Sequence, residues 1–479
     1  MLVAVGRLAT ALIAVATIRA VTSYLTPAQY GELALLLTVQ MFCGLFLVNP
    51  IGQHINLHTH MWWDDGTLSI RLNSYQKYVV AVSLVGGFAV LGMSKQDSAE
   101  HLLVAAAAMV AMIIAGTWNA TLIPMLNMLG FRAASVFWGI VTAVVSLGSS
   151  IFLVVWLPSA TGWFAGQAVG MALGALGAKY VFQRHAIQQS GISSRGSAPA
   201  LIDRQTILAY CLPLAMATGL MWLQQSGYRF IVEHYWGLAQ LGFLVAGLQL
   251  AGQISLLVES LAAQFFYPMF YRRCSNHMDI DAIASAYSDL INTLLPVYLL
   301  TAGLIAATSQ YLLYLLAAPQ YQDSVAFLMV GAGIELCRLV GNLLSNAAHV
   351  TRKSISLAIP YGVGAFTALT LLVIVGTRKA NFLWTGYSLM IGAAAMMISM
   401  WVMTSRLLKI RTDWLRMLGT FSAVTALYVL TYYSPAIVDI RSSLTWLGLN
   451  GFLVLAMALA LLWKNPATTR MLNVRLENK

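Results

Sequence analysis

The chain has 479 residues, of which 59% are hydrophobic and only 9% are charged. A soluble protein carries about 25% charged residues, so this composition excludes an ordinary soluble domain and indicates a protein that lies in lipid. The formal net charge of +11 does not call for a nucleic-acid partner, because basic residues accumulate beside the anionic cytoplasmic leaflet of a membrane.

Long apolar runs divide the sequence. A helix needs about 20 apolar residues to cross the hydrocarbon core, and inside lipid a helix satisfies all of its own backbone hydrogen bonds. The runs are too continuous for barrel strands, which would alternate over about ten residues. The sequence therefore predicts an all-α, polytopic membrane protein with about 14 transmembrane helices. In chain order, the predicted spans are residues 3–25, 31–50, 74–93, 102–124, 135–157, 161–182, 206–225, 237–262, 286–307, 324–346, 355–375, 382–404, 416–434 and 444–463.

Basic residues predict the direction in which the spans cross. With both termini placed in the cytoplasm, 19 of the 27 Lys and Arg side chains fall inside, five fall outside and three lie within spans. Cytoplasmic loops carry an excess of Lys and Arg. We therefore expect an even number of spans in the cell inner (cytoplasmic) membrane, with both termini cytoplasmic. The first apolar run is too long for a signal peptide and has no basic region before it.

A polar segment separates two groups of spans. Residues 183–205 are rich in Ser and Gly and carry basic residues, which is typical of a cytoplasmic linker. The motif AQYG at 28–31 returns as AQLG at 239–242, each preceded by an arginine at nearly the same distance. Parallel repeats around a midplane site are common in transporters. We predict an N-terminal six-helix half (1–182), a linker (183–205), a C-terminal six-helix half (206–404) and two additional helices with a cytoplasmic tail (405–479).

Several short segments resemble a known transporter family. Residues 19–31, which read RAVTSYLTPAQYG, look like the segment that joins the first two helices of bacterial polysaccharide flippases. That family shares a superfamily with the multidrug and toxin extrusion exporters. YCLP at 210–213, YRFIV at 228–232 and LGF at 241–243 resemble its seventh and eighth helices, and FFYP at 265–268 fits the end of the eighth. Two positions depart from the family: Ser23 stands where many members have arginine, and Tyr228 where many have an acidic residue.

The resemblance implies a function. It points to a flippase that moves a lipid-linked oligosaccharide or polysaccharide precursor, such as one for lipopolysaccharide, by alternating access. The charged head would cross in a hydrated cavity while the lipid tail stays in the bilayer. Such a protein is a transporter, not an enzyme, and needs no cofactor. Its expected partners are the lipid-linked glycan, membrane lipid and enzymes of glycan assembly, and we expect a monomer.

Four arginines within or beside spans are the candidate substrate-binding residues: Arg19, Arg7, Arg229 and Arg338. A charge at the bilayer centre costs about 2.5–3.5 kcal/mol on insertion scales, so it normally faces a bundle interior or an aqueous cavity. The planar arginine fork suits phosphate oxygens. The alternative for Arg7 and Arg19 is snorkelling to the two interfaces, and for Arg229 a surface pair with Glu233, four residues on.

Three carboxylates are the candidate coupling residues: Glu335, Asp289 and Glu259. Glu335 and Arg338 are spaced i, i+3 inside an apolar run, so a neutralising structural pair competes with a gating or substrate contact. Glu259 and Asp289 have no partner at helical spacing on their own runs. Either could carry a coupling proton, although carboxylates at a membrane interface are also common.

No further cluster carries chemistry. His54, His58 and His60 lie beside two tryptophans, but no acidic or cysteine ligand joins them at the spacing of a known metal-site family, and we interpret the segment as an interfacial loop. The four cysteines are scattered singly, so neither a disulfide framework nor a metal site is predicted. No motif for phosphate-loop, zinc-protease or serine-hydrolase chemistry occurs.

Two alternatives to the flippase hypothesis remain. A drug or metabolite exporter of the related branch would be expected to use a carboxylate in its cavity, whereas the embedded charges here lean towards arginine. A membrane glycan polymerase or ligase would usually need a large outside loop with catalytic residues. The longest outside gap, near 308–323, has Asp323 as its only charge, which makes this enzyme class the weaker alternative.

Overall fold

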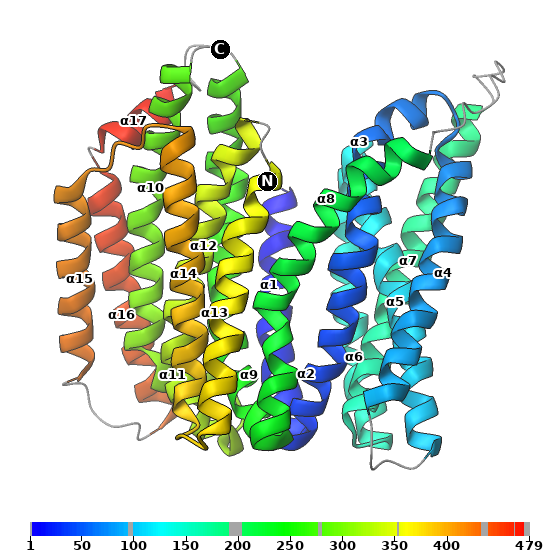
Figure 1. The fold of residues 1–479 in the computed structure, drawn as a ribbon, viewed down its shortest axis with the longest axis horizontal. Coiled ribbons are helices and arrows are strands. Elements are labelled where there is room, and N and C mark those ends of the chain that lie inside the picture. Colours follow the sequence, from blue (N-terminus) through cyan, green and yellow to red (C-terminus); the bar gives the residue numbers. More distant parts are fainter. Residues whose placement is uncertain are drawn as a thin grey trace. The chain divides into compact units, whose positions relative to one another are not determined.

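The computed structural model describes most of the chain as helix (Figure 1). The described ranges are residues 2–93, 99–190, 204–275, 280–351, 354–432, 439–463 and 465–473. Within them, every regular element is helical, as the composition and the long apolar runs predict. The chain divides into two compact units, Met1–Phe230 and Ile231–Lys479.

The first unit contains eight α-helices and two π-helical turns. In chain order these are α1 (Leu2–Tyr24), α2 (Pro27–Phe42), η1 (Cys43–Val48), α3 (Asn49–Asp64), α4 (Leu68–Met93), α5 (Ala99–Met128), α6 (Arg132–Trp156), α7 (Ala160–Ser190), α8 (Arg204–Trp222) and η2 (Leu223–Gly227). The unit ends within the first turn of α9.

The second unit contains most of α9 and the remaining helices. In chain order these are α9 (Tyr228–Ser275), α10 (Ile280–Ala307), α11 (Ser309–Leu316), η3 (Pro319–Ser324), α12 (Val325–Val350), η4 (Ser354–Leu357), α13 (Ala358–Thr377), α14 (Leu383–Leu407), α15 (Trp414–Tyr432), α16 (Ile440–Leu462) and α17 (Pro466–Asn473). Gly237 interrupts α9 with a φ of 82°, a conformation that costs glycine little because it has no Cβ.

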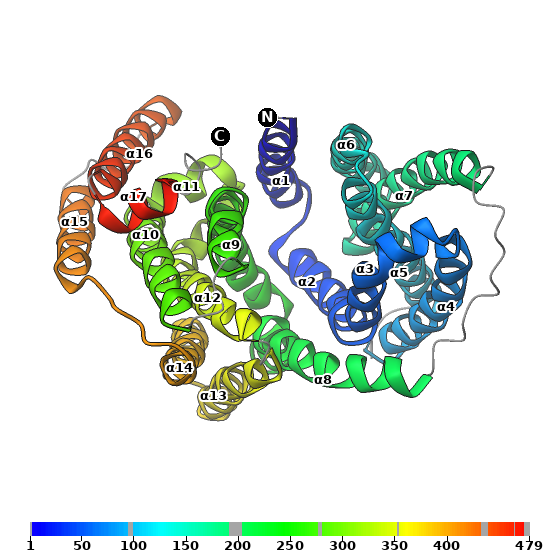
Figure 2. The ribbon, with the colours of Figure 1, turned by 90° about the horizontal axis from the view of Figure 1, so that it is seen from above.

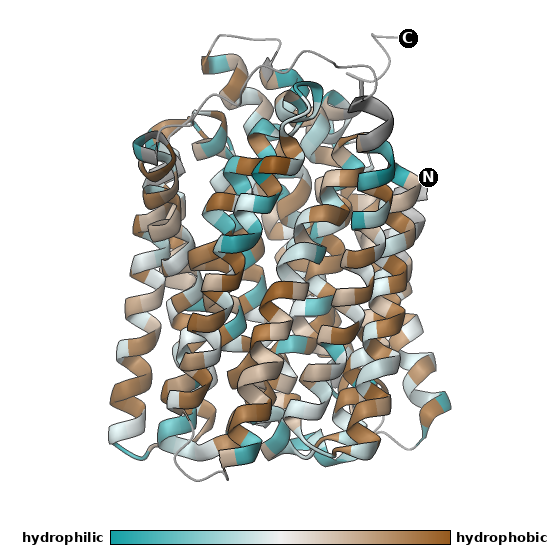
Figure 3. Ribbon diagram, turned by 90° about the vertical axis from the view of Figure 1, so that its right-hand side faces the viewer, coloured by the Kyte–Doolittle hydropathy of each residue, from teal (hydrophilic) through white to brown (hydrophobic). Residues whose placement is uncertain are grey.

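In the part of the chain that the structure describes, each of the fourteen predicted spans overlaps a helix. Eleven segments of the described chain are long and apolar enough to cross a membrane, and one of them, residues 207–274, covers two predicted spans. The other two predicted spans are α1, with an apolar stretch at Ala9–Tyr24, and α7. The chain is thus a multi-pass membrane protein. Apolar residues run the length of the long helices, and many hydrophilic ones lie near helix ends (Figure 3).

The predicted linker overlaps regular structure at its start. Residues 183–190 continue α7, and residues 191–203 lie outside the described residues. The segment around the three histidines is also helical, because α3 runs without a break from Asn49 to Asp64. The prediction of an interfacial loop in this segment is therefore wrong.

Small residues bring α6 and α7 close together. Gly166, Gly170 and Gly174 of α7 each lie so near α6 that an added Cβ would collide with it. The hydroxyl of Ser149 on α6 donates to the carbonyl of Gly166 at 2.6 Å, and Ser150 donates to the carbonyl of Trp163 at 3.0 Å. Close approach of small residues with interhelical hydrogen bonds is how helices associate in lipid.

The second unit is built around α10. This helix packs against α12, α15, α16 and α17, and Figure 2 shows α15, α16 and α17 beside it. Leu300 of α10, Leu427 of α15 and Val454 of α16 form a buried apolar cluster. The two additional helices are thus attached to the rest of their unit chiefly through α10.

Candidate functional site

Arg229 contacts α2 within the first unit. Its Nη1 donates to the backbone carbonyl of Ala34 at 3.1 Å and to the hydroxyl of Thr38 at 3.2 Å. Both acceptors are neutral. The partners of Arg229 are therefore on α2, and are not Glu233 as the i, i+4 spacing favoured.

The Nε of Arg229 has no acceptor among the residues that the structure describes. Its Nε is buried without a hydrogen-bond partner, and within the described chain no carboxylate forms an ion pair with this arginine. A buried donor without an acceptor costs about 1–3 kcal/mol. Nε and Nη2 form the side edge of the guanidinium, which binds carboxylate or phosphate oxygens in pairs. The guanidinium lies over the ring of Tyr228, 5.8 Å from its centroid, but Arg229 has no anionic partner among the described residues.

Two π-helical turns accompany this arginine. One, η2, ends at Gly227, two residues before Arg229, and the other, η1, follows Thr38 by one turn of α2. The Ser226 hydroxyl in η2 contacts the Met41 sulfur at 3.4 Å. π-helical turns are rare and often mark functional sites. The backbone therefore singles out the same place as the unpaired arginine edge.

The other two arginines of the first unit lie on α1. Arg19 is exposed, and its carbonyl accepts hydrogen bonds from the hydroxyls of Thr22 at 3.1 Å and Ser23 at 2.7 Å. Arg7 lies on the same helix, and its side chain is outside the described part of the structure. Of the three arginines in the first unit, Arg229 is therefore the one whose side-chain contacts are described above.

In the second unit, two carboxylates share one arginine. Arg338 of α12 donates through Nη1 to Glu259 of α9 at 2.8 Å and through Nε to Glu335 at 2.7 Å. Asn342 donates to the other oxygen of Glu259 at 2.7 Å. All three charged side chains are at most 20% exposed. The i, i+3 pair of Glu335 and Arg338 is confirmed, whereas sequence spacing gave no sign of Glu259, which is 79 residues from Arg338.

The cluster has an excess of negative charge when both carboxylates are ionised. One guanidinium cannot neutralise two carboxylates, and burial makes the charge that remains expensive. Protonation of one carboxylate would remove that excess. The arrangement can therefore bind and release one positive charge without unpairing Arg338.

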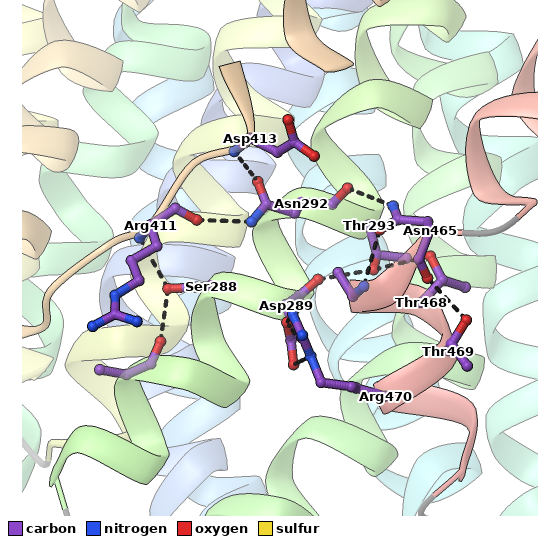
Figure 4. Close-up of polar contacts among 12 residues, drawn as sticks. Ser288, Asp289, Asn292, Thr293, Arg411, Asp413, Asn465, Thr468, Thr469 and Arg470 are labelled. Carbon is purple, nitrogen blue, oxygen red and sulfur yellow. Dashed lines mark hydrogen bonds and ion pairs between the residues drawn. The ribbon is translucent and has the colours of Figure 1, made fainter. Parts of the chain in front are cut away.

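Asp289 lies in a different environment, in the first half of α10 (Figure 4). It is 2% exposed and accepts hydrogen bonds from two arginines. Nη1 of Arg273 on α9 lies 3.0 Å from Oδ2. Arg470 on α17 uses its side edge, with Nε 3.1 Å from Oδ1 and 3.0 Å from Oδ2 and with Nη2 also bonded to Oδ1. Two arginines thus pair with this one carboxylate.

The residues around Asp289 connect α10 to both ends of the additional helices. Asn292 donates to the carbonyl of Arg411 at 2.7 Å, just before α15. Asn465, just before α17, donates to the carbonyl of Asn292 at 3.2 Å. Figure 4 shows the Arg411 side chain extending away from these contacts. One turn of α10 thus fixes the entry to α15 and the segment that follows α16.

Two of the three histidines take part in an aromatic cluster. The His54 and His58 rings lie 4.4 Å apart between their centroids, with Trp62 stacked on His58 and Tyr210 of α8 beside His54. No group of three or more potential ligands that could hold a metal was found among the described residues. These rings pack α3 against α8.

Solved structures of transporters share the fold of this chain. No family model and no curated protein matches the sequence. A structure of the lipid II flippase MurJ in an inward closed conformation matches over 95% of this chain and 97% of its own, with a TM-score of 0.67 and 10% identity. An inward-facing multidrug resistance MATE transporter of the MOP superfamily matches over 84% of this chain and 98% of its own, with a TM-score of 0.57 and 13% identity. An outward-facing MATE transporter matches over 89% and 94%, with a TM-score of 0.52 and 13% identity. The chain therefore has the fold of these MOP-superfamily transporters.

Proposed function

We propose that this protein is a flippase for a lipid-linked oligosaccharide or polysaccharide precursor with an anionic head. It moves the head from the cytoplasmic to the outer leaflet by alternating access. The shared fold with a lipid II flippase over 95% of the chain supports a transporter of this type. The unpaired side edge of Arg229 is the observation that carries the substrate class.

Arg229 carries a positive charge that no carboxylate of the described chain neutralises through an ion pair. A guanidinium in a membrane span is costly to keep, and Arg338 offsets that cost by pairing with carboxylates. Arg229 has only the neutral acceptors of Ala34 and Thr38. An anionic ligand with two oxygens would complete its hydrogen bonding, and a phosphate linking sugar to lipid has this chemistry. We propose Arg229 as the principal substrate contact, with Arg19 and Arg7 supporting it along α1.

The second unit supplies the proposed coupling group. We assign the coupled positive charge to the pair Glu259 and Glu335, with Arg338 as the fixed cation between them. Asp289 is the weaker coupling candidate because two arginines already neutralise it. Arg338 is likewise a weaker substrate contact than Arg229, since both of its bonded nitrogens face carboxylates.

A multidrug or metabolite exporter is the second candidate. The observation in its favour is the embedded carboxylate pair, together with the shared fold of the multidrug transporters. A cationic substrate would need this excess of negative charge, and it would leave the Arg229 edge without a role. A polymerase or ligase gains no support, since the structural neighbours are transporters.

The cellular setting forms part of the proposal. We place the protein in the cytoplasmic membrane with both termini inside, acting as a monomer beside enzymes of glycan assembly. Thiol labelling of single cysteines at Ser193 and in the C-terminal tail tests the topology in intact cells. Labelling of either position from outside would contradict it.

The test of the function uses proteoliposomes. A fluorescent polyprenyl-diphosphate sugar is supplied in one leaflet, and its appearance in the other leaflet is followed by quenching. We expect Arg229→Ala to slow flipping roughly 10–100-fold, since a hydrogen bond to a charged group is worth about 1.5–3 kcal/mol. Arg229→Lys should keep only part of the wild-type flipping rate, because an ammonium lacks the planar fork of a guanidinium.

The controls separate the two candidate functions. Arg416→Ala removes an arginine whose partner, Asp413, is 41% exposed, and it should flip at the wild-type rate. A polyprenyl sugar without phosphate should be a poor substrate. Wild-type flipping by Arg229→Ala, or equal flipping of the neutral lipid, would contradict the proposal. Proton-dependent extrusion of a cationic dye without lipid flipping would instead support the exporter.

A further inference from the structure

Thr38 of α2 has a hydroxyl whose hydrogen-bonding role is fixed by its surroundings. The residue is fully buried, and its hydroxyl donates to the carbonyl of Ala34 at 2.7 Å. A hydroxyl has a single proton to donate, so what it offers Arg229 is a lone pair. Nη1 of Arg229 donates to this hydroxyl oxygen at 3.2 Å and also to the Ala34 carbonyl at 3.1 Å. Three groups thus form a closed triangle with Nη1 at one corner.

The triangle is held from a second helix. The indole Nε1 of Trp222, the last residue of α8, donates to the carbonyl of Thr38 at 3.0 Å. The Trp222 ring packs edge-on against Phe42 of α2, with centroids 4.9 Å apart. Between Trp222 and Arg229 the chain passes through the π turn η2. Both ends of this short segment therefore contact α2 at Thr38.

Fixing Nη1 determines where the other nitrogens lie. The guanidinium is planar and rigid, so an anchored Nη1 leaves Nε and Nη2 as a single free edge with a set direction. In Arg470 the same edge receives the Asp289 carboxylate. In Arg229 no described residue occupies it.

We infer that Thr38 is a positioning residue for substrate binding: it holds Nη1 of Arg229 so that the Nε–Nη2 edge faces a phosphate of the transported lipid. The inference rests on the proposed function and names the phosphate-facing part of that same site. Thr38 touches Arg229 and acts through it. The opposing account is that Thr38 only satisfies a buried arginine and contributes to stability.

The test separates a positioning role from a structural one. Thr38→Val has nearly the same shape and removes the lone pair, and Thr38→Ser keeps the hydroxyl. With the fluorescent polyprenyl-diphosphate sugar as the probe, we expect Thr38→Val to raise the apparent KM about tenfold with little change in maximal rate. Thr38→Ser should keep the wild-type KM. Inorganic pyrophosphate should compete less well against Thr38→Val than against wild type.

A double-mutant cycle shows whether Thr38 acts through Arg229. In an Arg229→Lys background, Thr38→Val should add little to the KM, because the edge that it positions is gone. A full tenfold effect in that background would overturn the inference. If T38V does not accumulate in the membrane, Trp222→Phe replaces it, since this change removes the donor to the Thr38 carbonyl and keeps a ring. We then expect a two- to threefold rise in KM, and an unchanged KM overturns the inference.

The two proposals fail in different ways. If Arg229→Ala flips normally, the proposed function fails and the inference with it. If Arg229→Ala is impaired while Thr38→Val keeps the wild-type KM, the function stands and the positioning role is wrong. A variant with an unchanged KM but lower thermal stability assigns Thr38 to packing alone.

Discussion

The contact between Asp289 and Arg470 should control how firmly α17 is docked. Replacing either residue by alanine removes the ion pair between α10 and α17 and leaves the Thr293–Thr468 hydrogen bond between these helices, but only Asp289→Ala also releases Arg273 of α9. We therefore expect the two variants to loosen α17 equally. Asp289→Ala alone should also lower the stability of the whole second unit.

The magnitudes follow from exposure. Arg470 is 58% exposed, so its pair is worth about 1 kcal/mol or less after screening by solvent. Arg273 is 18% exposed, so its bond keeps about 1.5–3 kcal/mol, the usual value for a hydrogen bond to a charged group. About 1 kcal/mol corresponds to a roughly fivefold change in local opening. About 2 kcal/mol corresponds to a fall in Tm of roughly 4–8 °C for a unit of this size.

Thiol labelling measures the local effect. Met471 of α17 is fully buried, so Met471→Cys, in a chain without its four native cysteines, reports release of α17. The labelling rate should rise about fivefold in both Arg470→Ala and Asp289→Ala. Asp413→Ala removes a half-exposed carboxylate paired with Arg416 and should leave the rate unchanged. An unchanged rate in Arg470→Ala, or equal falls in Tm for both variants, would refute the reasoning.

Three further predictions concern other parts of the fold. Arg338→Ala leaves two carboxylates without their shared cation, so we expect a loss of about 3–5 kcal/mol, seen as a fall in Tm that is partly restored at low pH. Gly170→Ala forces a methyl group into α6 and should cost about 1–3 kcal/mol by the same measurement, whereas Gly148→Ala, with open space around it, should not destabilise. Hydrogen bonds from Ser442 hold the pKa of Asp439 below its usual 3.8, so this cap is intact above pH 3.8 and is lost as the pH falls through the lowered pKa. Hydrogen exchange at the Ser442 amide, corrected for its intrinsic pH dependence, should therefore accelerate at acidic pH, and an unchanged rate would contradict this assignment.

Local patterns in the sequence predicted local structure well. The apolar runs placed all fourteen spans on helices, and the spacing of Glu335 and Arg338 predicted their pair. These features depend on neighbours within one or two turns of the same helix.

Long-range pairing could not be obtained in this way. Glu259 binds Arg338 on another helix, and Asp289 binds Arg470, which lies 181 residues away. No periodicity along one helix encodes such contacts. Arg229 illustrates a second difficulty, because the π turn before it makes a regular α-helical count across residues 222–229 point the side chain in the wrong direction.

The π turn between Leu223 and Gly227 also bears on how this region tolerates changes in length. A π turn accommodates one more residue per turn than an α-helix, so the segment holds one residue beyond what an uninterrupted helix would need. Deleting Gln224 should let an α-helical turn close while Trp222 and Arg229 both keep their contacts with α2. On the other side of Arg229 the chain is α-helical and has no extra residue to lose. A deletion there would therefore rotate the helix that follows. Among related chains, gaps of one residue should therefore collect at this turn.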